Sequence, residues 1–157
     1  MIARVPISTD RAAILELFGD NAGHDRLLLA INRTKTIRSG SDESRVLMRF
    51  ASQFHAGTNF ELITAFYSTV AAMPTDGEKR NVLIFSVPLA LKSAMASELL
   101  LNATDKIENS SDRAAVLMSF VESNGLRNVK LEKTVFRVAA KITSSEERSR
   151  LARRAGR

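Results

Sequence analysis

An internal repeat constrains this sequence more than any other feature, because a chain that repeats a short unit stacks copies of one supersecondary structure. Five segments align without gaps over eleven positions. They begin at Val5, Ile37, Met73, Ile107 and Ile142, at intervals of 32, 36, 34 and 35 residues. Units of this length hold a pair of helices that cannot bury its apolar stripe alone, so neighbouring pairs must pack together.

Three aligned positions share a chemistry. An acid stands five positions after each start: Asp10, Asp42, Glu78, Asp112 and Glu147. A branched aliphatic residue stands nine positions after each start: Ile14, Val46, Val82, Val116 and Leu151. The next position holds Leu15, Leu47, Leu83 and Leu117, with Ala152 in the last copy. We expect these aliphatic residues to be buried, and each to contribute about 1.5–3 kcal/mol.

A capping residue stands two positions after four of the five starts. These residues are Ser39, Thr75, Asn109 and Ser144, each three residues before the acid. A short polar side chain at this position accepts a hydrogen bond from a free backbone N–H, and the following acid can bond back to the cap residue. We therefore expect each start to lead into a helix. The first copy has Ile7 at the cap position, so we expect Ser8 or Thr9 to cap there.

Other residues predict where these first helices end. Gly19, Gly57 and the pair Asn124–Gly125 favour the left-handed turn that ends a helix, and Pro88 is expected to end the third one. Thr58 and Glu61 form another capping box, which predicts the start of a second helix.

Apolar residues recur three, seven and eleven positions before the next start, at the spacing of one helix face. They are Leu62, Phe66 and Val70 before Met73, and Leu131, Val135 and Ala139 before Ile142. The predicted fold class is all-α: a right-handed α–α solenoid of about four helix pairs plus a C-terminal capping helix, in one domain over residues 1–157. The capping helix carries Arg148, Arg150, Arg153, Arg154 and Arg157, as the polar end of a stack should.

Two copies resemble a known bacterial repeat. The segment Met-Pro-Thr-Asp-Gly-Glu-Lys-Arg-Asn-Val-Leu from Met73 and the segment from Ile107 to Leu117 are similar to the pattern Ile-x-Ser-Asp-x-Glu-Lys-x-x-Val-Leu. Such repeats form HEAT-like or tetratricopeptide-like solenoids, and some occur with membrane zinc peptidases of the beta-lactam-sensor type. The resemblance implies a HEAT-like fold but no function, because the shared residues are caps and core. The peptidase motif His-Glu-x-x-His is absent from this sequence.

The net charge of +6 is concentrated at one end. Residues 127–157 carry +7, while the first 126 residues carry −1. Such asymmetry marks a surface for an acidic protein, nucleic acid or anionic lipid, or a solubilising end of the stack. No apolar run approaches the roughly 18 residues that span a bilayer, and no secretory signal is evident. We expect a soluble, cytoplasmic chain, which could also be a piece of a longer protein.

No motif for catalysis or for cofactor binding emerges. The chain has no cysteine, and its two histidines, His24 and His55, have no second ligand three or four residues away. There is no Gly-x-Ser-x-Gly elbow and no glycine-rich phosphate loop. Capping accounts for the repeated serines and acids. We therefore expect no enzymatic activity, no catalytic residue, no metal and no cofactor.

The outward face of the second helices is the candidate binding surface, because extended concave surfaces of helical stacks hold peptides or proteins. Five positions before each start stand Asn32, Ser68, Asn102 and Arg137, and nine positions before stand Leu28, Thr64, Glu98 and Lys133. The candidate binding residues are Ser68, Asn102, Lys130, Lys133, Arg137 and Lys141. Glu98 and Asp105 interrupt what would otherwise be a basic track for nucleic acid.

The leading hypothesis is a non-enzymatic scaffold that binds another protein or peptide, with an acidic segment as the partner. The alternatives are a nucleic-acid binder that uses the basic end, and a repeat fragment or engineered scaffold with no independent activity. The sequence does not specify the oligomeric state.

Overall fold

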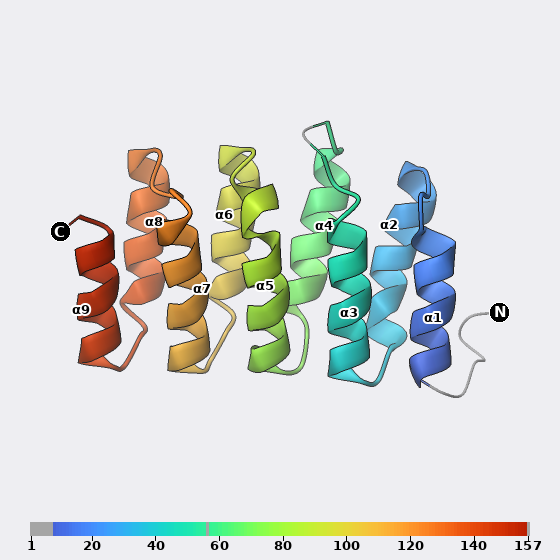
Figure 1. The fold of residues 1–157 in the computed structure, drawn as a ribbon, viewed down its shortest axis with the longest axis horizontal. Helices are drawn as coiled ribbons and strands as arrows, with labels where there is room; N and C mark the ends of the chain where they lie inside the picture. The colour runs from blue at the N-terminus through green and yellow to red at the C-terminus, as the bar shows by residue number, and fades with distance from the viewer. Residues whose placement is uncertain (1–7, 56, 157) are drawn as a thin grey trace.

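The computed structural model describes residues 8–55 and 57–156, and within these ranges it is all-helical (Figure 1). The described residues form nine α-helices and one 3-10 turn, with no strand. The predicted all-α class is confirmed. The repeat start at Val5 and the side chains of Ser8 and Thr9 lie outside the described residues, so the predicted first cap does too.

The helices alternate between two sets. The first helices of the pairs are α1 (Ser8–Gly19), α3 (Gly40–Ala51), α5 (Asp76–Ala90) and α7 (Ser110–Glu122), and α9 (Ser145–Arg154) follows in the same set. The second helices are α2 (His24–Arg33), α4 (Phe60–Ala71), α6 (Ala94–Thr104) and α8 (Val129–Ala139), and the short turn η2 (Thr34–Thr36) follows α2.

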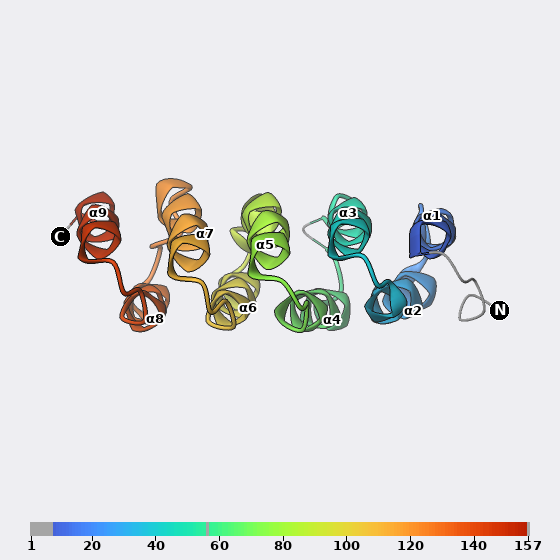
Figure 2. The same ribbon diagram turned by 90° about the horizontal axis from the view of Figure 1, so that it is seen from below.

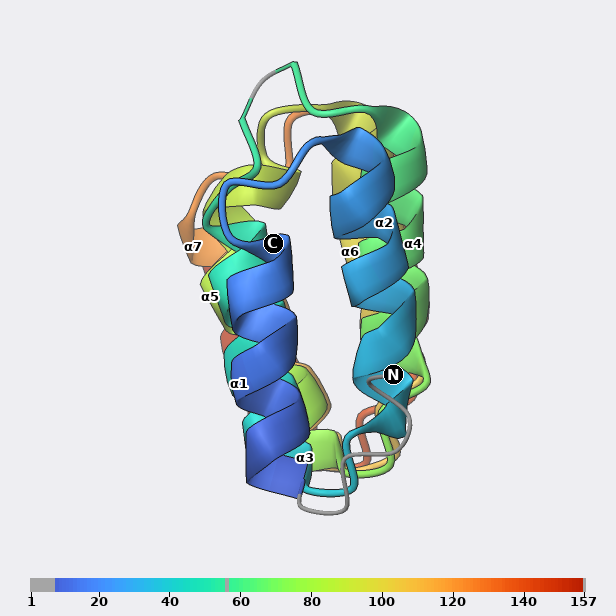
Figure 3. The same cartoon turned by 90° about the vertical axis from the view of Figure 1, so that its right-hand side faces the viewer.

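Each set forms one row of a two-layered stack. Helix α1 packs on α3, α3 on α5, α5 on α7 and α7 on α9, while α2 packs on α4, α4 on α6 and α6 on α8. Figure 2 shows the two rows one above the other, and Figure 3 shows the stack from the α1 end. Both rows run nearly straight in Figures 1 and 2. The row of second helices therefore presents a flat outer face and not the concave one expected from the sequence.

The core lies between the two rows and contains the predicted stripes. Four repeat starts, Ile37, Met73, Ile107 and Ile142, are buried at the junctions between pairs. The aliphatic pairs Val46–Leu47, Val82–Leu83 and Val116–Leu117 are fully buried, and so are the stripe residues Phe66, Val70 and Val135. Because equivalent residues of successive pairs are buried, they form one continuous core along the stack. Each pair thus buries its apolar stripe against the neighbouring pairs.

The first copy departs from this pattern. Ile14 is 37% exposed, whereas its equivalents Val46, Val82 and Val116 are fully buried. Each of those residues lies on a helix that has another first helix on both sides, whereas α3 is the one first helix that packs on α1 among the described residues. The prediction that Ile14 is buried was therefore wrong, because burial at this position depends on a neighbouring pair and not on the residue itself.

The predicted caps are mostly confirmed. The side chains of Ser39, Asn109 and Ser144 accept hydrogen bonds from the backbone N–H three residues later, at 3.3, 3.0 and 3.2 Å. Thr75 occupies the N-cap position of α5, but its side chain makes no capping bond.

The predicted capping box at Thr58 was wrong. The N-cap of α4 is Asn59, whose side chain accepts from the Glu61 N–H at 2.8 Å. The Thr58 hydroxyl instead accepts from the N–H of His55 at 2.7 Å and closes the preceding loop.

Two predicted helix ends were also wrong. Helix α3 ends at Ala51, well before Gly57, and the chain then turns so that Phe54 is buried against the Phe66 ring, with centroids 5.5 Å apart. Helix α5 continues past Pro88 to Ala90, and the Leu91 N–H still reaches the Val87 carbonyl at 3.0 Å. Proline removes one helical hydrogen bond, and burial on both sides of it keeps the chain helical here.

Candidate functional site

The predicted binding residues all lie on the outer face of the second helices. Ser68 is on α4, Asn102 is on α6, Lys130, Lys133 and Arg137 are on α8, and Lys141 follows α8. All six are exposed. The equivalent positions Asn32, Ser68, Asn102 and Arg137 form one exposed row across the four pairs, as the register predicts. We call this surface the α2–α8 face.

Helices α6 and α8 bring three of these residues together around Asp105. The Arg137 guanidinium lies 3.3 Å from the Asn102 side-chain oxygen and 3.2 Å from the Asp105 carboxylate. Lys141 lies 2.7 Å from the other oxygen of Asp105. Partial burial of Asp105 would raise its pKa, but Lys141 and Arg137 outweigh it and lower the pKa below the usual range. Asp105 therefore remains ionised beside these two cations at neutral pH.

The acids on α6 reduce the charge that the basic end can offer a partner. Lys130 lies 2.7 Å from Glu98, in the same relation of one repeat length that links Arg137 to Asp105. In the sequence Glu98 and Asp105 interrupt a basic track, and in the structure they are ion partners of the basic residues on and after α8. Their spacing of 32 residues from Lys130 and Arg137, close to the repeat length, was the signal for this. Lys133 has no ion partner among the described residues.

Ser68 lies apart from this cluster, at an apolar hollow between α2 and α4. The hollow has a volume of about 590 Å³ and is open to solvent. It is lined by Leu28, Asn32, Asn59, Phe60, Glu61, Thr64, Ala65 and Ser68. The Phe60 side chain is 47% exposed at its edge. A half-exposed aromatic ring beside an open hollow is a feature of protein-docking surfaces. The sequence analysis named Ser68 but missed Phe60.

A second hollow lies between the loop that joins α1 to α2 and the loop that joins α3 to α4. It has a volume of about 660 Å³ and both histidines line it. His24 Nε2 lies 3.3 Å from Glu61, and the His55 ring accepts from the Gly57 N–H at 3.1 Å. No group of three or more His, Cys, Asp or Glu residues that could hold a metal occurs in residues 8–55 and 57–156. In the same residues no helix is long and apolar enough to cross a membrane.

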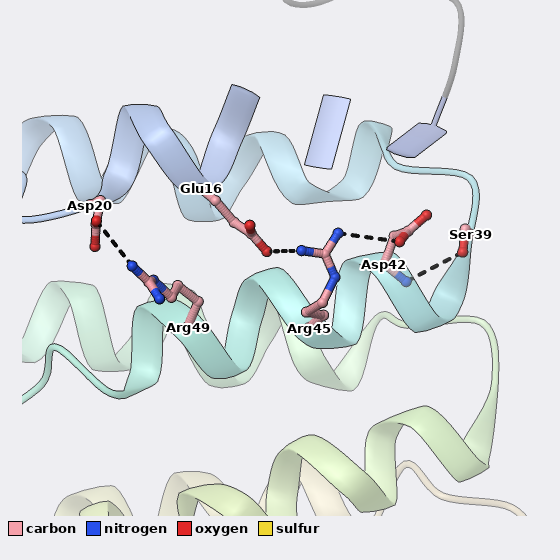
Figure 4. Close-up of polar contacts among 6 residues, drawn as sticks. All are labelled: Glu16, Asp20, Ser39, Asp42, Arg45 and Arg49. Atoms are coloured by element: carbon pink, nitrogen blue, oxygen red, sulfur yellow. Dashed lines mark hydrogen bonds and ion pairs between the residues drawn. The ribbon is translucent and has the colours of Figure 1, made fainter. Parts of the chain in front are cut away.

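The opposite face, formed by α1, α3, α5, α7 and α9, carries its own ion pairs (Figure 4). Arg45 of α3 pairs with Glu16 of α1 and with Asp42, while Arg49 lies 3.0 Å from Asp20. Ser39 caps the same helix beside Asp42. Arg154 on α9 reaches Glu122 on α7 at 3.4 Å, as Arg49 reaches Asp20 three repeats earlier. These contacts join neighbouring first helices and leave this face largely neutralised.

A further set of charged residues was missed by the sequence analysis, six positions after each repeat start. Arg11 donates to the Thr36 carbonyl at 3.0 Å, Lys79 to the Lys106 carbonyl at 3.2 Å, and Arg113 to the Lys141 carbonyl at 2.8 Å. Each acceptor is the residue just before the next repeat start. These side chains therefore join the first turn of one pair to its junction with the next pair.

Comparison with protein-family models, with curated proteins and with solved structures finds no match to this chain.

Proposed function

We propose that this chain is a non-enzymatic α-solenoid of the HEAT-like type, and that its α2–α8 face binds an acidic segment of another protein. The observation that carries the proposal is the apolar hollow beside Phe60, which lies on the same exposed face as the basic residues of α8. An apolar anchor in a pocket supplies affinity, and a charged rim selects the partner.

The basic end supports an acidic partner. Residues 127–141, which form α8 and its flanks, carry +4, and the ion pairs to Glu98 and Asp105 neutralise only part of that charge. Lys133 keeps its charge available on the α2–α8 face. A segment with one apolar side chain near α4 and acidic side chains near α8 would match both features.

Selection from a displayed library of random peptides, followed by affinity measurement on the selected peptides, tests the proposal. We expect the selected peptides to combine an aromatic or aliphatic anchor with acidic residues. Phe60→Ser and Lys133→Glu should each weaken binding at least tenfold. Phe85 provides the matched control, because it is 48% exposed on α5, in the opposite row. Phe85→Ser should leave the affinity unchanged.

Two outcomes would overturn the proposal. One is selected peptides whose binding is equally insensitive to Phe60→Ser and Phe85→Ser. The other is submicromolar binding of short labelled DNA or RNA that falls steeply with salt and is lost in the triple variant Lys133→Glu, Arg137→Glu and Lys141→Glu. Such salt dependence would make the basic end a phosphate-contacting surface.

A further inference from the structure

Glu43 occupies the repeat position at which other pairs place a basic donor. It stands six residues after Ile37, as Lys79 stands six after Met73 and Arg113 six after Ile107. Glu43 is 4% exposed, Lys79 is 8% and Arg113 is 6%, and these three are the buried charged residues of the described chain. A buried ionised carboxylate needs a donor partner. The backbone N–H of Glu43 bonds to the Ser39 carbonyl, but its carboxyl group has no hydrogen bond or ion pair to another described residue.

The matching acceptor is also unused. In the pairs with a basic donor, the acceptor is the residue just before the next start: Thr36, Lys106 and Lys141. The equivalent residue for Glu43 is Ala72, just before Met73. No hydrogen bond reaches the Ala72 carbonyl within the described residues. An ionised carboxylate cannot donate to a carbonyl oxygen, but a protonated one can.

We propose that Glu43 forms a proton-dependent contact between the second and third helix pairs. Its protonated carboxyl donates to the Ala72 carbonyl in the place of the lysine or arginine used elsewhere. Loss of that proton breaks the contact and loosens the junction between α4 and α5. This junction is internal to the stack, so the inference is independent of which partner binds the α2–α8 face.

The surroundings of Glu43 favour the neutral form. Burial raises its pKa from 4.5 to about 7, against the opposing effect of Lys35 on η2. The charged groups at this end of the packed elements are Asp10 and Arg11 on α1, Arg33 on α2, Lys35 on η2, and Asp76, Glu78 and Lys79 on α5. Helix α4 carries one charged residue, Glu61, at its opposite end, where it pairs with His24.

Three other cations nearby already have partners of their own. Arg11 donates to Thr36, while Lys79 bonds to both Asp76 and Lys106. On α3 itself, Arg45 pairs with Glu16 and Asp42. The positive charge of Lys35 lowers the pKa of Glu43 and so offsets part of the rise that burial causes.

The direction of the pH effect follows from linkage. The folded-state pKa of Glu43 is raised above its unfolded value, so its stabilising contribution is complete below about pH 4.5 and is lost as the pH rises to about 7. The difference between 4.5 and about 7 corresponds to a rise of up to about 300-fold in the unfolding equilibrium constant. The junction between α4 and α5 should open more often as the pH rises, and this opening would break the hydrogen bond from the Met73 N–H to the Val70 carbonyl.

Two measurements on the full chain test the proposal. Carbon-13 NMR of the side-chain carboxyls should find one glutamate, identified by its absence in Glu43→Gln, that titrates near pH 7. Native-state hydrogen exchange, corrected for the chemical exchange rate, should show at least tenfold faster opening at the Met73 amide at pH 8 than at pH 5. The equivalent Ile107 amide, which bonds to Thr104 at the junction joined by Lys79, should not change.

The variants separate the contact from a merely structural role. Glu43→Gln and Glu43→Lys both keep a donor at every pH, so both should remove the pH dependence at Met73. Glu108→Gln changes an exposed glutamate and should preserve it. A Glu43 carboxyl that titrates at its ordinary value, or a Met73 amide with the same pH response in wild type and Glu43→Gln, would overturn the proposal. The NMR titration on the wild-type chain decides the question even if both variants fail to fold.

Discussion

Asp76 on α5 holds the start of α7: its Oδ2 lies 2.7 Å from the backbone nitrogen of Asn109 and 2.9 Å from that of Glu108. Its other oxygen accepts from the Lys79 ammonium at 3.1 Å. The Asp76 carboxylate, in the first turn of α5, thus accepts from two backbone N–H groups that precede α7. Lys79 in turn donates to the Lys106 carbonyl, so the two side chains together hold two backbone N–H groups and one carbonyl of this junction.

Replacement of Asp76 by alanine should destabilise the stack by about 1.5–3 kcal/mol, because three hydrogen bonds to a charged group are lost. Partial burial would raise the pKa of Asp76, but the Asn109 N–H, Lys79 and the Glu108 N–H together lower it. Its contribution is therefore present above the ordinary pKa of 3.8 and is lost as the pH falls through the lower folded value. Urea unfolding between pH 2 and pH 7 measures this, with Glu108→Gln as the control; equal acid sensitivity in wild type and Asp76→Ala would contradict it.

The caps make unequal contributions, although their sequence pattern is the same. The Asn109 side chain accepts from the Asp112 N–H at 3.0 Å, whereas the Thr75 side chain makes no capping bond. We expect Asn109→Ala to cost about 1 kcal/mol, and Thr75→Ala to cost clearly less. Chemical denaturation of the two variants gives both values. A loss for Thr75→Ala as large as that for Asn109→Ala would show that Thr75 caps α5 in solution.

The sequence predicts the parts of this structure that depend on local periodicity. The stripes Leu62–Phe66–Val70 and Leu131–Val135–Ala139 and three of the four named caps are confirmed, because each follows from spacing along one helix or one turn. Ile14 and Pro88 were predicted wrongly because neighbouring helices decide their surroundings. The pairs Lys130–Glu98 and Arg137–Asp105 join residues one repeat length apart, and such contacts become visible only when the copies are stacked.

Two glycines that look alike in the sequence should respond oppositely to alanine. A Cβ at Gly125 would lie 2.6 Å from the Phe120 carbonyl oxygen, and backbone cannot move aside. A Cβ at Gly77, inside α5, would meet nothing within 4 Å. We expect Gly125→Ala to cost about 1–3 kcal/mol and Gly77→Ala to add about 0.5–1 kcal/mol, because alanine is the better helix former. The midpoint temperature of thermal unfolding should fall for Gly125→Ala and rise for Gly77→Ala. A higher midpoint for Gly125→Ala would contradict the tight turn after α7.

Tyr67 offers a spectroscopic measure of the core, because it is the chain's one tyrosine and the chain has no tryptophan. Its hydroxyl is buried between the rows and donates to Ser86, with its oxygen 3.3 Å from Oγ. Burial raises the pKa of Tyr67 well above its usual range, against the opposing effect of its hydrogen bond with Ser86. Stability from this group is therefore complete below about pH 10 and is lost as the pH rises further. As the pH rises, phenolate absorbance should appear only together with the loss of helical circular dichroism. Tyr67→Phe should lower the free energy of unfolding at neutral pH by about 1 kcal/mol, because a hydrogen bond is lost. The same variant should shift alkaline unfolding to higher pH. A phenolate that forms near pH 10 while the helices remain intact would show that the α4–α5 interface admits solvent.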